Sequence, residues 1–491
     1  MRYDRGFDFA AIRIHAPLSA ASIASRSAFR AMLALALPVL AEESLNLLVA
    51  YTDWFLAGRF LPGEEPKAAM SLVAYVLWML PSLFSIVGIG ALAIVARLIG
   101  AGQRQDAVHV ARQSLIVGAI AAAMGMALAA IFGGTFVSAM QLRGEAAVLA
   151  TRYIHILAPA IPFVMLEQVG TACLRGSGDT VSGLIARVVV NIVNALLSTT
   201  LVTGLGLFPS FGWDGLAIGT ATGHCVGGSI ILYRLIWGRG GIHLGSPIAG
   251  GERPCNRPSL IDPTTIRRIL RIGVPGGIDV WSVLTCHLVY VAIINSLGTL
   301  AQAAHGLGLQ IEAMSYLAGS AFSVAAATIA GQALGAADQR GAVRGVLLCA
   351  GAAATIMSAA GLVMFIGGEW LASFFTGQRD ELTTLVGRLL RIVAISCPAL
   401  AILSVILGAL RGSGDTRFTL AITFIGLVGI RLPGACLLAW SEVPIPFTDL
   451  ALPGANLGVA GAWWAMVTDV MLRSALAAAR FAQGGWKRIR V

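Results

Sequence analysis

A carboxylate inside an apolar run is the residue of this sequence best able to do chemistry. Asp53 lies deep in the first such run, with aromatic residues on both sides. A charged side chain among apolar groups is costly, so a lone carboxylate there suits reversible binding of a proton or a cation. The alternative is a carboxylate at the mouth of the run that pairs with Arg59. We favour the first interpretation.

Polar side chains in other apolar runs could serve the same chemistry. An amide or hydroxyl near the carboxylate could hydrogen-bond it or help to ligate a cation. Hydrogen bonds between helices, and a buried histidine with its needs satisfied, are the plainer explanations. The candidates for ion coupling beside Asp53 are Asn191, Asn194 and Thr220, and those for a substrate cavity are Asn46, His287, Gln310 and Glu312.

Other charged and reactive residues are interpreted as structural. Asp469 and Arg473 are four residues apart, which suits an ion pair on one helix. Glu42 or Glu43 is expected to meet an arginine such as Arg187. The sequence contains no evident Ser/His/Asp or Cys/His constellation, so we expect no enzyme and no cofactor. The seven scattered cysteines predict neither a disulfide framework nor a metal site.

A seven-residue segment occurs twice and divides the chain. Residues 174–180 and 410–416 both read LRGSGDT, 236 positions apart (410 − 174 = 236). The segment lacks the Lys-Ser/Thr of a phosphate-binding loop. Its glycines permit a tight reversal, its arginine marks the cytoplasmic face, and its aspartate is placed to cap the next helix. We therefore predict structural or gating turns at Arg175, Gly176, Gly178, Asp179, Arg411, Gly412, Gly414 and Asp415.

The composition defines the environment that these residues share. Hydrophobic residues make up 57% of the 491 residues and charged residues only 12%, against roughly 25% charged residues in soluble domains. Long apolar runs between short turns indicate transmembrane helices rather than a barrel of alternating strands. The net charge of +10 lies mainly in turns on one side, so it does not indicate nucleic-acid binding.

The sequence predicts an all-α polytopic membrane protein with six transmembrane helices in each half. Two copies in the same orientation are related by a pseudo-two-fold axis along the membrane normal. The predicted domains are a cytoplasmic tail (1–30), a first lobe (31–238), a cytoplasmic linker (239–263), a second lobe (264–482) and a cytoplasmic tail (483–491). The twelve predicted helices are 31–58, 68–98, 107–133, 146–173, 181–205, 213–238, 264–297, 301–334, 341–367, 381–410, 417–440 and 456–482.

Arginine placement predicts the orientation. The turns after even-numbered helices, the linker and both ends of the chain are basic, whereas the opposite turns are poorer in arginine and mixed in charge. By the positive-inside rule, both termini and the linker are cytoplasmic. The first 29 residues lack the apolar core of a secretory signal. We expect a monomer in the cell (inner) membrane that contacts lipid and small-molecule substrates.

Several motifs resemble the multidrug and toxic compound extrusion (MATE) family over about residues 31–480. The resemblance implies two six-helix lobes around a V-shaped central cavity. It also implies export of organic cations or amphipathic compounds, in exchange for protons or sodium, by alternating access. The matching residues are LRGSGDT in both halves, Pro38 followed by Thr52-Asp53 and Gly58-Arg59, Gly100-Ala101-Gly102, Ala303-Ala304-His305, and residues 331–336.

The resemblance also assigns individual residues. Asp53 matches the family's acidic residue in the first helix, and Thr220 matches its threonine in the sixth. Asn191 matches the asparagine of the fifth helix, and Asn46 stands at a glutamine position. The departures are Ala195, where the family has an acidic residue, and Val283, where the NorM-type branch has a glutamate. A third is the tenth predicted helix, where that branch has an acidic residue and this sequence has only Glu381 at the outer entry.

These departures favour the DinF-type branch, in which coupling centres on the first lobe. Our hypothesis is proton-coupled antiport through Asp53, with sodium as the alternative ion. A flippase for a lipid-linked or polysaccharide precursor, from the same superfamily, is the alternative function. A channel or a non-transporting membrane scaffold is a third hypothesis for the function.

Overall fold

The computed structural model describes residues 26–489 and 491, apart from 206–208, 238–241, 246–260 and 445–450. Most of the predicted N-terminal tail and most of the predicted linker lie outside the described residues. Residues 26–30, which we predicted to belong to the tail, form the beginning of α1. The described residues are mainly helical, as the sequence predicts. A small antiparallel pair, β1 (Glu442–Pro444) and β2 (Ala451–Pro453), follows the eleventh helical run.

The first half forms six helical runs, some of them interrupted. Their elements are α1 (Arg26–Phe60), α2 (Glu65–Leu83) with α3 (Ser85–Gly100), α4 (Arg104–Ala139), α5 (Gly144–Leu157) with η3 (Ala158–Ala160), α6 (Ile161–Met165), η4 (Leu166–Gly170) and α7 (Thr171–Ser177), α8 (Val181–Thr203) and α9 (Trp213–Trp237).

The second half repeats this order. Its elements are α10 (Pro263–Asn295), α11 (Thr299–Gly335), α12 (Gln339–Thr376), α13 (Glu381–Ala394) with α14 (Cys397–Gly412), α15 (Thr416–Gly426) with η5 (Leu427–Arg431) and α16 (Leu432–Ala439), α17 (Gly458–Gln483) and the short η6 (Gly485–Arg488). Within the described residues, ten runs are long and apolar enough to cross a membrane. The pair α13 and α14, bent by 53°, makes an eleventh, and α17 is the twelfth run.

Four of the helical runs are broken in the structure, whereas the sequence predicts uninterrupted helices. Pro81 precedes the break between α2 and α3, and Pro398 lies in the first turn of α14. Proline lacks a backbone donor and clashes with the preceding turn, so it bends or ends a helix. The segments η4 and η5 are π-helical. Such segments are rare and occur frequently at functional sites.

Each half has its own hydrophobic core, and the beginning of each half's first helix packs in the core of the other half. Met32 and Leu35 of α1 are buried in the core of the second half. Ile269 and Ile272 of α10 are buried in the core of the first half. The helices α1 and α10 therefore cross between the lobes. A movement of either helix changes the packing of both cores.

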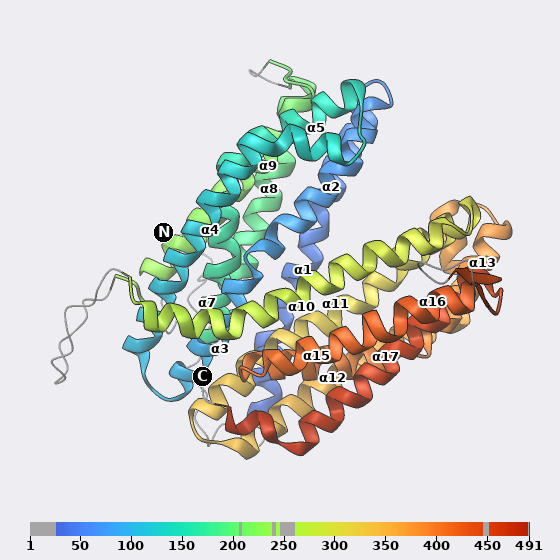
Figure 1. Ribbon diagram of the computed structural model, residues 1–491. Helices are drawn as coiled ribbons and strands as arrows, with labels where there is room; N and C mark the ends of the chain where they lie inside the picture. Colours follow the sequence, from blue (N-terminus) through green and yellow to red (C-terminus); the bar gives the residue numbers. More distant parts are fainter. Residues whose placement is uncertain (1–25, 206–208, 238–241, 246–260, 445–450, 490) are drawn as a thin grey trace, which may run out of the picture.

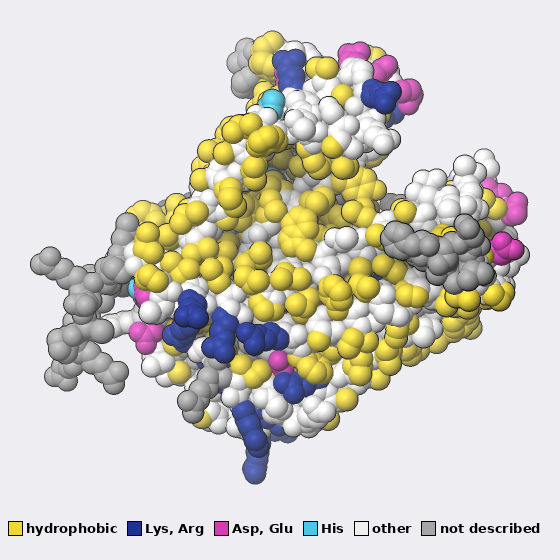
Figure 2. All heavy atoms as spheres, viewed as in Figure 1, with side chains coloured by type: hydrophobic (Ala, Val, Ile, Leu, Met, Phe, Trp, Pro, Cys, Tyr) yellow, Lys and Arg dark blue, Asp and Glu magenta, His cyan; other side chains and the backbone are white. Residues whose placement is uncertain are grey.

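The two lobes diverge at one end and meet at the other. In Figure 1, the tips of α2 and α5 lie far from those of α13 and α16, whereas α3, α7 and α15 lie near the opposite end with the C-terminus. Figure 2 shows the hollow between the two diverging arms, and Lys and Arg side chains gathered near the closed end. The structure thus has the V-shaped cavity that the family resemblance implies.

The closed end is held by a close contact between α3 and α11. A Cβ atom at Gly100 would collide with the backbone of Gln332, and one at Gly335 would collide with the backbone of Arg97. The side chain of Gln332 also donates to the carbonyl oxygen of Gly176 at 3.0 Å. Because Thr328 of α11 donates to the neighbouring carbonyl of Arg175 at 3.0 Å, the first repeated turn is bound to the second lobe.

Candidate functional site

Asp53 lies at the centre of a buried polar cluster in the first lobe. Its side chain is fully buried. The hydroxyl groups of Thr220 and Tyr153 donate to its Oδ2 at 2.7 Å and 3.0 Å. The amide of Asn194 donates to its Oδ1 at 3.2 Å. These hydrogen-bond partners are neutral, so the carboxylate is solvated by the protein without a counter-ion among them.

Four helices bring this cluster together. Asp53 lies on α1, Tyr153 on α5, Asn194 on α8 and Thr220 on α9. The helices α8 and α9 approach closely at Gly219, the neighbour of Thr220, because glycine has no side chain. A Cβ atom there would meet the backbone nitrogen of Ser198 at 2.7 Å. Small residues allow such close packing of transmembrane helices.

Hydrogen bonds within the cluster link its members to one another. The Asn194 amide nitrogen lies 2.9 Å from the Thr220 hydroxyl and 3.3 Å from the Ser198 hydroxyl. Ser198 follows Asn194 by four residues and therefore lies on the same face of α8. The amide oxygen of Asn194 is buried and has no partner among the described residues. The cluster therefore holds an unused acceptor next to the carboxylate.

The ion-coupling residues predicted from the sequence are only partly brought together. Asp53, Asn194 and Thr220 form one cluster. Asn191 does not join it, since its amide donates to the carbonyl of Arg187 on the preceding turn of α8 at 2.9 Å. Asn191 and Asn194 are three residues apart and so lie close together on α8, but only Asn194 is buried against Asp53.

A second buried cluster surrounds Glu167 in the π-helical segment η4. His224 Nδ1 lies 3.1 Å from Glu167 Oε2, and an Arg187 nitrogen lies 3.4 Å from the same oxygen. Thr220 and His224 are four residues apart on α9, so the two clusters share one helix face. We predicted an acidic partner for Arg187 in α1, and the structure corrects this to Glu167.

The repeated arginines each bind the first helix of their own half. Arg175 Nη2 donates to Glu42 at 2.8 Å, with Glu43 at 3.8 Å. Arg411 donates to the fully buried Asp279, with its Nη2 at 2.6 Å. These contacts tie the end of α7 to α1 and the end of α14 to α10. They support the structural or gating role predicted for the two turns.

The repeated aspartates differ from each other. Asp179 accepts from the backbone nitrogen of Ser182 at 3.0 Å, so it caps the beginning of α8 as predicted. Asp415 makes no capping bond to α15. Its carboxylate accepts from Arg480 Nε at 2.9 Å instead. The capping prediction for Asp415 is wrong because an arginine of α17 reaches the carboxylate.

Two predicted cavity residues lie where the lobes meet. Gln310 of α11 donates to the hydroxyl of Tyr51 on α1 at 3.4 Å. The His287 ring of α10 lies 6.4 Å from the ring of Trp78 on α2, at an edge-to-face angle. Tyr51 and Trp78 are exposed, so each of these two contacts includes an exposed aromatic side chain.

The other two predicted cavity residues have different surroundings. Asn46 is exposed on α1, and its amide donates to Glu43 at 3.1 Å. Glu312 lies inside the second lobe, where its Oε2 is buried without a partner among the described residues.

Asp469 forms the predicted pair with Arg473, and Arg431 binds the same carboxylate at 2.8 Å.

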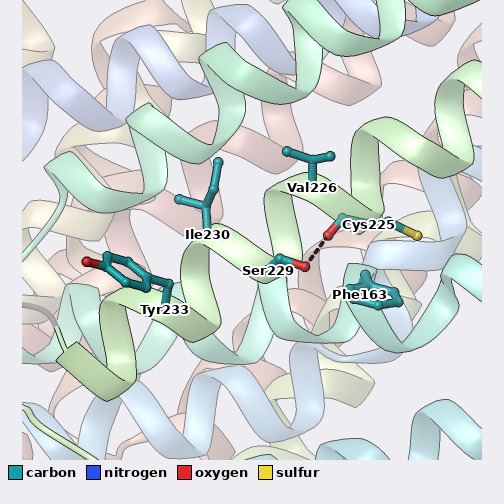
Figure 3. A pocket seen from close by; sticks show the side chains of 6 residues that line it. All are labelled: Phe163, Cys225, Val226, Ser229, Ile230 and Tyr233. Atoms are coloured by element: carbon teal, nitrogen blue, oxygen red, sulfur yellow. Dashed lines mark hydrogen bonds between the residues drawn. The ribbon is translucent and has the colours of Figure 1, made fainter.

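A separate pocket of about 390 Å³ lies on α6 and α9. Figure 3 shows its lining, which includes Phe163, Ile230 and Tyr233, and the 2.7 Å hydrogen bond from Ser229 to the carbonyl of Cys225. That bond joins residues four apart on one helix, so the Ser229 hydroxyl donates within α9. We assign no role to this pocket, because Asp53 and its partners are not among its lining residues.

Comparison with known proteins decides the family. A family model described as MatE matches residues 38–200 and again residues 275–437. The chain belongs to the MatE family. The two matches begin 237 residues apart (275 − 38 = 237), in agreement with the duplication that the repeated turn predicts. Nothing in the match specifies the DinF-type branch.

Similar proteins cover nearly the whole MatE chain. The "Probable multidrug resistance protein NorM" of Thermotoga maritima is 27% identical over 465 residues, which are 93% of each chain. The "Multidrug resistance protein MdtK" of Proteus mirabilis is 25% identical and covers 84% of this chain and 88% of its own. A solved MATE structure described as the bent conformation matches with a TM-score of 0.80 at 21% identity, over 94% of this chain and 96% of that one. The fold is therefore that of MATE transporters.

Sequence reasoning missed three residues of the two clusters. Tyr153 donates to Asp53, and Glu167 and His224 form the second cluster. A signal was present for each, because a hydroxyl, a carboxylate or an imidazole inside an apolar run needs a partner when it is buried. The sequence does not show which helix face each side chain occupies, so it could not assign the partners.

Proposed function

We propose that this chain is a secondary active multidrug efflux antiporter of the cell membrane, which exports organic cations or amphipathic compounds in exchange for protons. The multidrug resistance names of relatives that match nearly the full chain support the efflux part. The observation that carries the ionic part is the fully buried Asp53 with its neutral hydrogen-bond partners.

A proton is the ion that fits Asp53 most directly. An unpaired carboxylate is costly to bury, and a bound proton removes that cost. The hydrogen bonds from Tyr153, Thr220 and Asn194 stabilise the charged form, so the site accommodates both states. Binding and release of one proton then change the charge at the centre of the first lobe.

Asn194 is suited to respond to that change. Its amide nitrogen donates to the ionised carboxylate. Its buried amide oxygen has no partner among the described residues. Rotation of the amide by half a turn would present this oxygen to a protonated Asp53, whose O–H then donates. The hydrogen bonds to Thr220 and Ser198 would change with it.

Helix α1 can carry the change to the rest of the molecule. Asp53 lies in its second half, inside the first lobe, whereas Met32 and Leu35 near its beginning are buried in the core of the second lobe. When a proton alters the hydrogen bonds of Asp53, α1 repacks against both lobes. This repacking would shift the balance between the two orientations of alternating access.

The distribution of charge supports an outward-facing orientation of the cavity. Lys and Arg side chains gather near the closed end in Figure 2. By the positive-inside rule, this end faces the cytoplasm and the V opens to the outside. Asp53 would then take its proton from outside as the substrate leaves.

Sodium is the alternative coupling ion. The oxygens of Asp53, Thr220, Ser198 and Asn194 are of the type that binds hard cations. A sodium site would require the Asn194 oxygen, and not its nitrogen, to face the centre of the cluster. The proton hypothesis is preferred because it needs only the carboxylate and the three donors that already contact it.

The deciding experiment is dye transport in proteoliposomes under imposed gradients. Purified protein is reconstituted with a fluorescent organic cation, and a proton gradient and a sodium gradient are imposed separately. We expect uphill dye movement with the proton gradient alone. We expect Asp53→Asn to slow it at least about tenfold, which corresponds to ~1.4 kcal/mol.

Asp106→Asn is the matched control, because Asp106 is an exposed carboxylate at the beginning of α4. It should transport like the wild type. If Asp53→Asn still moves the dye uphill at the wild-type rate, Asp53 does not couple the ion. If the sodium gradient alone drives transport, the coupling ion is sodium.

A further inference from the structure

A basic groove lies near the closed end of the second lobe, away from the Asp53 cluster. It has a volume of about 760 Å³ and lies between the first turns of α10 and of α15. Arg267 and Arg271 of α10 line it together with Arg417 of α15, and Ile266 and Leu270 form its apolar part. Figure 2 shows the Lys and Arg side chains that gather over this region.

The three arginines of this groove carry charge that the described protein does not neutralise. Other arginines nearby are occupied: Arg411 binds Asp279, Arg480 binds Asp415, and Arg268 donates to the carbonyl of Val491. In the described ranges, by contrast, the exposed Arg267, Arg271 and Arg417 have no acidic partner. Three guanidinium groups in one groove therefore favour an anionic ligand.

The length of α10 predicts that the groove lies at the depth of lipid headgroups. The 33-residue helix α10 is ~50 Å long, about 20 Å more than the hydrocarbon core. Arg267 and Arg271 are four and eight residues from its beginning at Pro263, or ~6 Å and ~12 Å along its axis. Each end of such a helix passes through the headgroup layer. Phosphate groups and the first acyl carbons are both present there.

We propose that this groove binds an anionic phospholipid. The guanidinium groups of Arg267 and Arg271 are one turn apart and can bind phosphate oxygens in a bidentate manner. Arg417 reaches the headgroup from α15, and Ile266 and Leu270 contact the acyl chains. Basic pockets between transmembrane helices on the cytoplasmic side are known to suit such headgroups.

A bound lipid would join two helices that the protein does not join by charge. It bridges α10 and α15 on the face of α10 that carries Arg267 and Arg271. Ile269 and Ile272 on the other face pack in the core of the first lobe. Occupancy should therefore stabilise the contact between the lobes and raise the thermal unfolding midpoint.

The test measures lipid binding and thermal unfolding of the full chain in a neutral detergent. Cardiolipin and phosphatidylglycerol are compared with phosphatidylcholine by native mass spectrometry, with the unfolding midpoint as a second readout. We expect the anionic lipids to bind and to stabilise, and phosphatidylcholine to do neither. Arg267→Gln with Arg271→Gln should weaken binding on the order of tenfold, since each basic residue near a headgroup contributes appreciably.

Arg340→Gln with Arg344→Gln is the matched control. These exposed arginines are also four residues apart near the beginning of a helix, α12. The control should bind lipid like the wild type. Arg417→Gln alone tests the groove with less change to α10, in case the double variant does not fold. It should weaken binding by a few fold.

Four results would overturn the proposal. Equal loss in the control would show general surface attraction. Equal stabilisation by phosphatidylcholine would show that charge is not recognised. Inorganic phosphate that stabilises as strongly as cardiolipin would assign the groove to a free anion. Retention of anionic lipid by both groove variants would exclude these arginines from the site.

Discussion

The two halves of the molecule agree at their repeated turns and differ at the centres of their first helices. In both halves, the arginine of the turn binds a carboxylate of the first helix, which is Glu42 in one half and Asp279 in the other. These two acids are 237 positions apart (279 − 42 = 237). In both halves, the threonine of the turn donates to a backbone carbonyl of the first helix. The duplicated contacts are therefore those that hold each lobe together.

The difference lies at Asp53 and its counterpart, Tyr290 (53 + 237 = 290). Asp53 accepts hydrogen bonds from three helices. The hydroxyl of Tyr290 is buried without a partner among the described residues. The duplication kept the architecture in both copies, and the carboxylate suited to ion coupling is in one copy alone at this position.

The acid of each repeated pair offers the largest expected effect on stability. Removing one partner of a buried ion pair costs about 3 kcal/mol or more. Asp279→Asn should therefore lower the thermal unfolding midpoint strongly. Glu42→Gln should cost less, because Glu43 lies 3.8 Å from Arg175 and can replace it. Unfolding of both variants in detergent, with Glu42→Gln/Glu43→Gln as a third, measures this. Equal loss in the two single variants would contradict it.

Two buried tyrosines test the difference between the centres. Tyr153→Phe removes a donor to the Asp53 carboxylate, and a hydrogen bond to a charged group contributes about 1.5–3 kcal/mol. Tyr290→Phe removes a hydroxyl that has no described partner, so it should be neutral or slightly stabilising. Unfolding midpoints and proton-driven dye transport should both fall for Tyr153→Phe alone. A larger loss for Tyr290→Phe would reverse the functional assignment of the halves.

The turn glycines should respond alike, with a small difference. Gly178 and Gly414 have φ values of +96° and +91°, where an alanine costs on the order of 1 kcal/mol. A Cβ at Gly414 would also meet a Val491 methyl at 2.7 Å, whereas the nearest atom at Gly178 is at 3.5 Å. Gly414→Ala should therefore destabilise more. Gly125→Ala, where the nearest atom is at 3.7 Å, is the control. A stabilised Gly414→Ala protein would contradict the reasoning.

The smallest effect concerns the beginning of α10. Hydrogen bonds from Thr264, Thr265 and His109 hold the pKa of Asp262 below its ordinary value. Such a group stabilises the fold above its unfolded pKa of about 3.9, and that contribution is lost as the pH falls through the lower folded value. Asp262→Ala should cost about 1 kcal/mol near neutral pH. The difference from the wild type should shrink in acid, which pH-dependent unfolding can measure. A difference that grows in acid would contradict it.

Helix number, most helix ends and half of the candidate site could be predicted from the sequence. Two helices run further than predicted, because α4 ends at Ala139 and not at 133, and α12 ends at Thr376 and not at 367. Apolar runs bounded by Gly, Pro and Arg gave the twelve runs, and isolated polar residues gave Asp53, Asn194 and Thr220. The π-helical segments could not be predicted, because the apolar pattern continues through them. The partners of Arg187 and Asp415 could not be predicted either, since residue spacing along a helix does not determine which neighbour each face meets.

The close contact of α3 with α11 at Gly100 and Gly335 has a mechanical consequence. Two backbones lie against each other there with no side chain that could swing aside. Because no side chain can give way there, a movement of the lobes at this end displaces the two helices as whole bodies. Each atom added at position 100 or 335 would push α3 and α11 apart. A series of larger residues there should therefore shift the resting orientation of the transporter in steps.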